Sequence, residues 1–197
     1  MKKLFYSSIL FALVVVMAVS CSKDSTKTIT ETPAKSTIAG GYVVDASIAL
    51  AYDSYEFGNK FYVSRNGNIT KLGCKMAETG SFRVSLWDFA TQNLIAATTI
   101  TITDTSQFVY NIVSPIAVTA NTRYVISLNN TSAGAFKKYF SYYKKPASGP
   151  SIYPFTTGSV TYENYREKLS ATSAFPDSFF PNWALIGVSD FQFEYTE

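Results

Sequence analysis

From Gly40 onward, hydrophobic and polar positions alternate with the two-residue period of a β-strand rather than the 3.6-residue period of a helix. In the stretch 81–88, the apolar residues Phe82, Val84 and Leu86 alternate with serine and arginine. This arrangement is typical of a strand with one face on a hydrophobic core. We therefore expect these three side chains to be buried.

Similar short runs recur along the chain, with turn-forming residues between them. The runs cover 72–76, 97–103, 108–113, 124–128 and 191–195, and the turns 66–68, 78–80, 104–106 and 129–130. Strands about ten residues apart with Gly, Asn, Asp or Ser between them are typical of an antiparallel sandwich. We predict an all-β fold, an antiparallel jelly-roll-like β-sandwich, as a single domain over residues 40–197. The composition of 162–169 (YENYREKL) favours one or two helical turns there.

The first 20 residues have the anatomy of a secretory signal peptide. Two lysines precede an apolar stretch over 4–19, which is short for a membrane-spanning helix. The ending Ala18-Val19-Ser20-Cys21 resembles a bacterial lipobox, in which the cysteine receives acyl chains such as palmitate. We expect Cys21 to be lipidated and to anchor the protein to a membrane; the alternative is an ordinary cleaved signal.

Residues 22–38 contain eight serines and threonines among 17 positions, with few large apolar side chains. We predict that 21–39 form the lipidated cysteine and a flexible tether. Ser22-Lys23-Asp24 resembles short export signals of outer-membrane lipoproteins. We therefore expect an exported protein on the outer membrane, facing either the periplasm or the cell surface, with the surface favoured.

The composition excludes several kinds of chemistry. The chain contains no histidine, so catalytic triads with an imidazole base and histidine-ligated zinc sites are excluded. Its two cysteines are too few for a four-thiolate metal site, and we predict no metal and no cofactor. If Cys21 is lipidated, Cys74 is the remaining thiol, and its place beside Leu72 and Met76 indicates a buried core residue.

Net charge gives no support for nucleic-acid binding. The formal charge is +3, and removal of Lys2 and Lys3 with the signal leaves 15 basic against 14 acidic residues, or about +1. A nucleic-acid-binding domain usually carries a clear basic excess. We expect no nucleic acid among the partners.

Three strings carry a family resemblance. They are FRVSLWD at 82–88, LIAAT at 94–98 and SPIAVTANTRYVIS at 114–127. Together they resemble bacterial domains of unknown function that recur in secreted and cell-surface proteins and are regarded as jelly-roll sandwiches. The resemblance implies a sandwich fold and brings no catalytic residues. Against that pattern, the segment 134–181 is interpreted as an aromatic and basic insertion that carries the individual function.

The segment 137–145 (KKYFSYYKK) places four lysines around four aromatic residues. Such a segment could stack on the faces of sugars, hold an anionic polysaccharide through its lysines, or stack on single-stranded nucleic acid. The alternative is an edge or amphipathic strand, with lysines that prevent pairing between sheet edges.

Residues 136–197 hold 16 of the 31 aromatic residues. Most are expected in the core, while a smaller group is expected to be exposed and to form a platform for a pyranose ring with nearby lysines. The candidate ligand-binding residues are Tyr139, Tyr143, Tyr153, Tyr162, Tyr165, Trp183, Lys144 and Lys145.

Eight carboxylates offer the chemistry of a glycosidase, which needs no histidine, but nothing in the sequence pairs two of them. They are Asp45, Asp53, Glu56, Asp88, Glu163, Glu167, Asp177 and Asp190. A calcium site built from oxygens of Asp45 and Asp53 is chemically possible, but the sequence contains no dense Asp/Asn/Gly loop. We predict a non-catalytic, lipid-anchored envelope module that binds carbohydrate or another envelope component. The alternatives are a structural or adhesin-type subunit that docks a protein, and then a carboxylate-based glycosidase.

Overall fold

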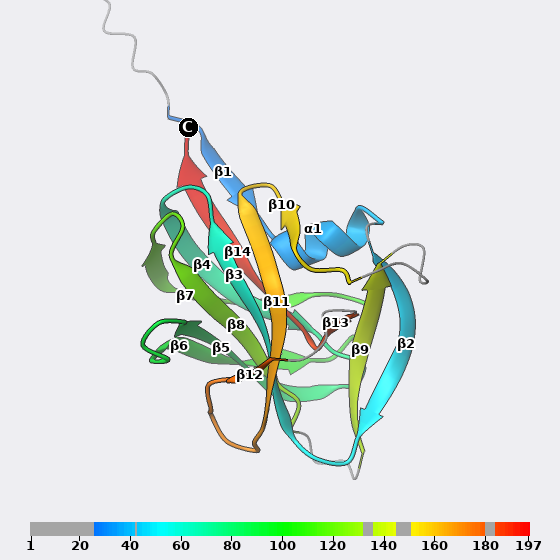
Figure 1. The fold of residues 1–197 in the computed structure, drawn as a ribbon. Coiled ribbons are helices and arrows are strands. Elements are labelled where there is room, and N and C mark those ends of the chain that lie inside the picture. The colour runs from blue at the N-terminus through cyan, green and yellow to red at the C-terminus, as the bar shows by residue number, and fades with distance from the viewer. Residues whose placement is uncertain (1–25, 42, 132–135, 145–150, 180–183) are drawn as a thin grey trace, which may run out of the picture.

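The fold is an antiparallel β-sandwich, as seen in a computed structural model of the chain (Figure 1). The structure describes residues 26–41, 43–131, 136–144, 151–179 and 184–197, with the backbone alone for 43–50. The signal peptide and Cys21 lie outside the described residues. Every strand pairing among the described residues is antiparallel, which confirms the predicted fold class.

The largest sheet has the strand order β10-β11-β3-β8-β5-β6, with the short β12 paired to β11. Its strands are β3 (Tyr55–Val63), β5 (Gly80–Asp88), β6 (Leu94–Ile102), β8 (Arg123–Asn129), β10 (Phe155–Thr157), β11 (Val160–Leu169) and β12 (Ser178–Phe179). The middle of this sheet is therefore made by β3 and β8, which come from distant parts of the chain.

Two smaller sheets pack against the large one. The four-stranded sheet, in the order β1-β14-β4-β7, contains β1 (Thr28–Glu31), β4 (Gly67–Lys75), β7 (Val109–Val118) and β14 (Val188–Thr196). The three-stranded sheet, in the order β13-β9-β2, contains β2 (Val43–Ala51), β9 (Lys137–Lys144) and β13 (Ala184–Ile186). It stands at one side of the sandwich and contacts β11 and β14 (Figure 1).

The core lies between the large sheet and the four-stranded sheet. Phe82, Val84 and Leu86 of β5 are buried, as their alternation predicted. Across the interior, the rings of Phe61 on β3 and Phe191 on β14 lie 4.6 Å apart. Because each inward position removes apolar area from water, this alternation is the main source of the sandwich's stability.

The predicted helical turns at 162–169 are wrong. These residues form β11, which pairs with β3 along its length and with β10 and β12 on its other side. A local preference for helix is worth only tenths of a kcal/mol per residue, and two neighbouring strands outweigh it.

The domain begins earlier than the expected boundary at residue 40. β1 pairs with β14, and the short helix α1 (Pro33–Ala39) starts with a proline that suits the first turn. The side chain of Asp190 on β14 accepts hydrogen bonds from the backbone amides of Ala34 and Lys35, both at 3.0 Å. Residues 28–39 thus belong to the folded domain, and of the predicted tether only the positions before Thr26 lie outside the described residues.

The supposed insertion at 134–181 is also part of the sandwich. Its described residues supply β9, β10, β11 and β12, and β11 is an interior strand of the large sheet. Removal of this segment would expose the edge of β3 and open the core. It is therefore structural as well as a candidate for function.

Cys74 is fully buried on β4, as predicted. Burial raises the pKa of its thiol to about 12, because the thiolate is poorly solvated there. We expect iodoacetamide to leave Cys74 unmodified in the native protein at mildly alkaline pH and to alkylate it in concentrated guanidinium chloride. Peptide mass mapping reads this out, and labelling of Cys74 at equal rates in both conditions would contradict burial.

Within the described part of the chain, no helix is long and apolar enough to cross a membrane.

Candidate functional site

Three of the tyrosines expected on the surface are buried, so their predicted exposure is wrong. Tyr153, Tyr162 and Tyr165 are 5%, 0% and 1% exposed. Tyr162 faces inward on β11, with its ring 5.0 Å from that of Phe155 and 6.0 Å from that of Phe61. The sequence shows that these rings are amphipathic, but only the strand pairing decides which side faces the core.

Tyr153 is held below the surface by a polar contact. Its hydroxyl donates a hydrogen bond to the side-chain oxygen of Asn59, which is itself fully buried on β3. Burial raises the pKa of Tyr153 well above its ordinary value. A buried phenol whose hydroxyl is engaged in this way is not available to stack on a ligand from solvent.

The remaining candidates divide between β9 and residues outside the described chain. Tyr139, Tyr143 and Lys144 are half-buried on β9, whereas Trp183 and Lys145 fall outside the described residues. The alternative of a strand is confirmed for 137–144, but β9 is the middle strand of its sheet, between β13 and β2, so the prediction of an edge strand is wrong. Its aromatic side chains therefore do not form one continuous exposed row.

A pocket of about 310 Å³ opens where the three-stranded sheet meets the large sheet. It is lined by Ala51, Tyr52, Asp53, Tyr55, Phe57, Tyr139, Tyr165, Glu167 and Ile186. We call this the tyrosine pocket. Two of the predicted site residues, Tyr139 and Tyr165, meet here, although they come from different sheets.

The wall of the tyrosine pocket is a set of touching aromatic rings. Tyr55 and Phe57 lie on β3 with parallel rings whose centroids are 5.6 Å apart. Phe57 also packs against Tyr139 of β9 at 4.8 Å and against Tyr165 of β11 at 6.4 Å. Phe57 therefore holds rings from three strands in one wall.

A glycine between β13 and β14 allows this close packing. Gly187 has a φ of 59°, a left-handed backbone conformation that residues with a side chain rarely adopt. A Cβ atom there would lie 2.7 Å from the Cβ of Phe57. The glycine thus lets the chain pass the ring closely and leaves Ile186 on the pocket wall.

The tyrosine pocket also contains two carboxylates, Asp53 and Glu167. The Tyr165 hydroxyl donates a hydrogen bond of 2.6 Å to Oε2 of Glu167. Burial raises the pKa of Tyr165, and this bond to Glu167 raises it further; burial and the charge of Glu167 also raise the pKa of Tyr139. Both phenols therefore stay protonated near neutral pH and remain hydrogen-bond donors.

The tyrosine pocket lies far from the beginning of the folded domain. It is formed by the turn between β2 and β3 and by the end of β11, at the bottom of Figure 1. β1 and the C-terminal end of β14 lie at the opposite end of the molecule (Figure 1).

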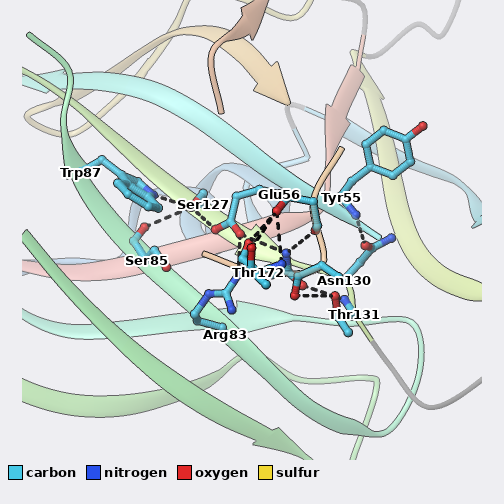
Figure 2. Close-up of polar contacts among 12 residues, drawn as sticks. Tyr55, Glu56, Arg83, Ser85, Trp87, Ser127, Asn130, Thr131 and Thr172 are labelled. Carbon is cyan, nitrogen blue, oxygen red and sulfur yellow. Dashed lines mark hydrogen bonds and ion pairs between the residues drawn. The ribbon is translucent and has the colours of Figure 1, made fainter. Parts of the chain in front are cut away.

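A second polar cluster lies beside the pocket but is closed. Figure 2 shows Arg83, Ser127 and Trp87 arranged around the buried carboxylate of Glu56. Its oxygens accept hydrogen bonds from Ser127 at 2.6 Å, Arg83 at 2.8 Å and Asn129 at 3.0 Å. This carboxylate is fully engaged inside the protein, so the cluster is structural.

The carboxylates considered for catalysis lie in different environments and do not form one group. Asp190 and Glu56 are buried, and Glu163 bridges Lys60 and Arg123. Asp53 and Glu167 share a pocket, whereas the side chain of Asp45 lies outside the described part of the structure. Among the residues that the structure describes, no group of three or more Cys, Asp or Glu side chains is placed to hold a metal ion.

Sequence reasoning missed most of the pocket wall. Tyr52, Tyr55, Phe57 and Ile186 were not among the candidate residues. The available signal was the turn Tyr52-Asp53-Ser54-Tyr55, which places two aromatic residues beside a carboxylate between two strands. Tyr52 is 79% exposed, and its ring lies 5.1 Å from that of Phe136, which is 47% exposed, so the two form a small exposed aromatic patch.

The fold and the pocket define a β-sandwich domain with an open, aromatic-lined cavity at one end. Residues 43–183 match the model of a family described as Domain of unknown function (DUF4082), and the chain belongs to that family. This confirms the resemblance to an uncharacterised domain. The match runs through 134–181, so that segment lies within the family domain. Comparison with curated proteins finds no significant match.

Proposed function

We propose that this protein is a lipid-anchored, non-catalytic module of the cell envelope that binds carbohydrate in the tyrosine pocket. The observation that carries the proposal is the combination of an aromatic wall with two carboxylates in one open cavity. The apolar face of a pyranose ring packs on aromatic side chains, while carboxylates accept hydrogen bonds from its hydroxyls. The pocket volume is at the lower end of the usual range for small-ligand sites.

Tyr139 supplies apolar surface to the cavity, while the buried Tyr165 acts through the carboxylate that it holds. Tyr139 is half-buried, so part of its ring faces the cavity while the rest packs on Phe57. The Glu167 carboxylate is positioned by the Tyr165 hydroxyl. A fixed acceptor beside a rigid ring favours binding because little side-chain freedom is lost when the ligand arrives.

The position of the pocket is compatible with the proposed anchor, because the two are at opposite ends of the domain. Acyl chains on Cys21 would hold the N-terminal end of the domain at the membrane. The pocket, at the far end from β1, would then face outward (Figure 1). We propose the outer membrane as the site and favour the cell surface; protection of the domain from protease on intact cells would contradict surface display.

Tyr52→Ala is expected to weaken glycan binding by roughly tenfold, because loss of one stacked ring removes about 1–2 kcal/mol of contact. Tyr52 is exposed, so its removal should leave stability nearly unchanged. A glycan array followed by calorimetry on the best ligand measures the change. Phe179→Ala is the matched control, since Phe179 is 60% exposed but lies outside the pocket.

Absence of binding to any glycan by the folded protein would contradict the carbohydrate proposal. Equal weakening by Tyr52→Ala and Phe179→Ala would place the site elsewhere. Turnover of chromogenic glycosides, with loss of activity in Glu167→Gln, would instead favour the glycosidase alternative.

The alternative of a protein partner is favoured by exposed apolar side chains around the pocket mouth. Tyr52, Phe136 and Leu169 are 79%, 47% and 63% exposed, and the rings of Tyr52 and Phe136 are 5.1 Å apart. Exposed apolar groups that lie together are typical of docking surfaces. Cross-linking in isolated outer membranes distinguishes this case, because a fixed protein partner would then be captured at these residues.

A further inference from the structure

We propose that the tyrosine pocket recognises a cationic ammonium group on its ligand, so that amino sugars with unacetylated amines are the preferred glycans. This inference rests on the proposed carbohydrate-binding function and narrows it to a chemical class. It is carried by the aromatic faces around the cavity and by the sign of the charges that line it.

The first observation is the number of aromatic rings. Five of the nine lining residues are aromatic, and they come from the β2–β3 turn and from strands β3, β9 and β11. The face of an aromatic ring carries negative electrostatic potential, so several rings around one cavity stabilise a cation between them. Tyr52 is exposed and Tyr55 and Tyr139 are half-buried, so these three rings are the ones that an ammonium group in the cavity would contact, whereas Phe57 and Tyr165 are buried in the wall.

The second observation is the charge of the lining. Asp53 and Glu167 both line the pocket, and among the described residues no lysine or arginine lines it. Two basic residues, Lys137 and Lys168, lie near the pocket but are not among its described lining residues. Lys137 lines a neighbouring hollow that shares Tyr52 and Asp53, and Lys168 pairs with Asp177 at 2.6 Å.

The third observation is that Glu167 is fixed and only partly solvated. It is held by the Tyr165 hydroxyl at 2.6 Å, and Tyr165 is itself 1% exposed. A charge that is shielded from bulk water interacts more strongly with an opposite charge than a fully solvated one does. The same arrangement disfavours sulfated or carboxylated polysaccharides, which the lysine-rich β9 had suggested from sequence.

Calorimetric titration of the purified protein tests the proposal with four probes. They are oligosaccharides of glucosamine, their N-acetylated counterparts, neutral glucose oligosaccharides and tetramethylammonium. Glucosamine oligosaccharides are expected to bind at least about tenfold more tightly than the acetylated series, with affinity that falls as salt rises. Tetramethylammonium is expected to compete with them.

Glu167→Gln is the decisive variant because glutamine keeps an acceptor for the Tyr165 hydroxyl while it removes the charge. We expect about a tenfold loss of affinity for glucosamine oligosaccharides. Glu197→Gln is the control, since it removes one surface carboxylate at the opposite end of the domain, where Glu197 lies 3.6 Å from Arg65. It should leave binding unchanged.

The outcomes separate the two proposals. Equal binding of the amino and N-acetylated series, unaffected by Glu167→Gln, would overturn the cationic inference and leave carbohydrate binding intact. Binding of tetramethylammonium without any sugar would overturn carbohydrate binding but support ammonium recognition. No binding of any of the four probes would overturn both.

Discussion

Glu56→Gln is expected to lower the free energy of unfolding by about 3 kcal/mol, because it leaves buried donors without their carboxylate. Glu56 is fully buried and accepts hydrogen bonds from Arg83, Ser127 and Asn129. A glutamine at this position has one acceptor oxygen in place of two, and its amide would face the same donors. The value is at the lower end for a broken buried pair, since the Arg83 side chain is 26% exposed and keeps some contact with water.

The loss should spread through neighbours of Glu56. Ser127 both donates to Glu56 and accepts a hydrogen bond of 2.8 Å from the Trp87 indole (Figure 2). Asn129 links the same carboxylate to the backbone oxygen of Ser170, which fastens the loop after β11. A change at Glu56 therefore loosens three strands and one loop at once.

Urea unfolding followed by tryptophan fluorescence measures this effect. Glu163→Gln is the matched control, because Glu163 also pairs with two basic residues but is 22% exposed. We expect the control to cost less than about 1 kcal/mol. Equal destabilisation by the two variants would contradict the structural importance of the Glu56 cluster.

Asp190 is expected to make stability fall as pH rises from about 4 to about 6. Asp190 is fully buried, and burial raises its pKa from 3.8 to about 6, despite hydrogen bonds from Tyr110, Ala34 and Lys35 that act in the opposite direction. Because the folded pKa lies above the ordinary value, protonation favours the folded state. This contribution is complete below the ordinary pKa and is lost as pH passes the folded pKa.

The size of the effect follows from the shift. A pKa raised from 3.8 to about 6 corresponds to about 3 kcal/mol at most, and relaxation of the surroundings will reduce it. Two carboxylates that are not buried, Asp88 and Asp177, have pKa values lowered by hydrogen bonds from Thr91 and Lys168, and they act in the opposite direction. The dependence of stability on pH is therefore the sum of a contribution that falls with pH, from Asp190, and contributions that rise with pH, from Asp88 and Asp177.

A comparison with Asp190→Asn isolates the contribution. Asparagine is close in shape to a protonated aspartic acid and does not titrate. The stability of the native protein minus that of the variant should fall between about pH 4 and about pH 7, by up to about 3 kcal/mol. A difference that rises with pH would show that the three hydrogen bonds outweigh burial, and Asp104→Asn, at an exposed turn, should show no such fall.

Much of the fold was accessible from the sequence, because alternation is a local property. The burial of Phe82, Val84 and Leu86 follows directly from their spacing, and Cys74 follows from its place on an apolar face. The family strings at 82–88 and 114–127 lie in β5, β7 and β8. These elements are predictable because one buried face sets their pattern whatever strand lies beside them.

The errors have a common physical cause. Residues 162–169 have a helix-compatible composition but become β11 because β3 and β10 lie on either side. Residues 28–39 are polar, yet they fold because β14 and Asp190 provide pairing and a cap for them. In both cases the deciding partner is distant along the chain, so no local pattern could reveal it.

The sequence by itself determined the class of fold and excluded chemistry that needs histidine, and it predicts export and lipidation at Cys21. Only the tertiary structure decided which aromatic residues face a cavity. Tyr139 and Tyr165 meet Tyr52, Tyr55 and Phe57 because three strands from two sheets converge at one end of the sandwich. The composition gives the number of aromatic rings, but strand pairing and sheet packing decide whether each ring lies in the core or lines the cavity.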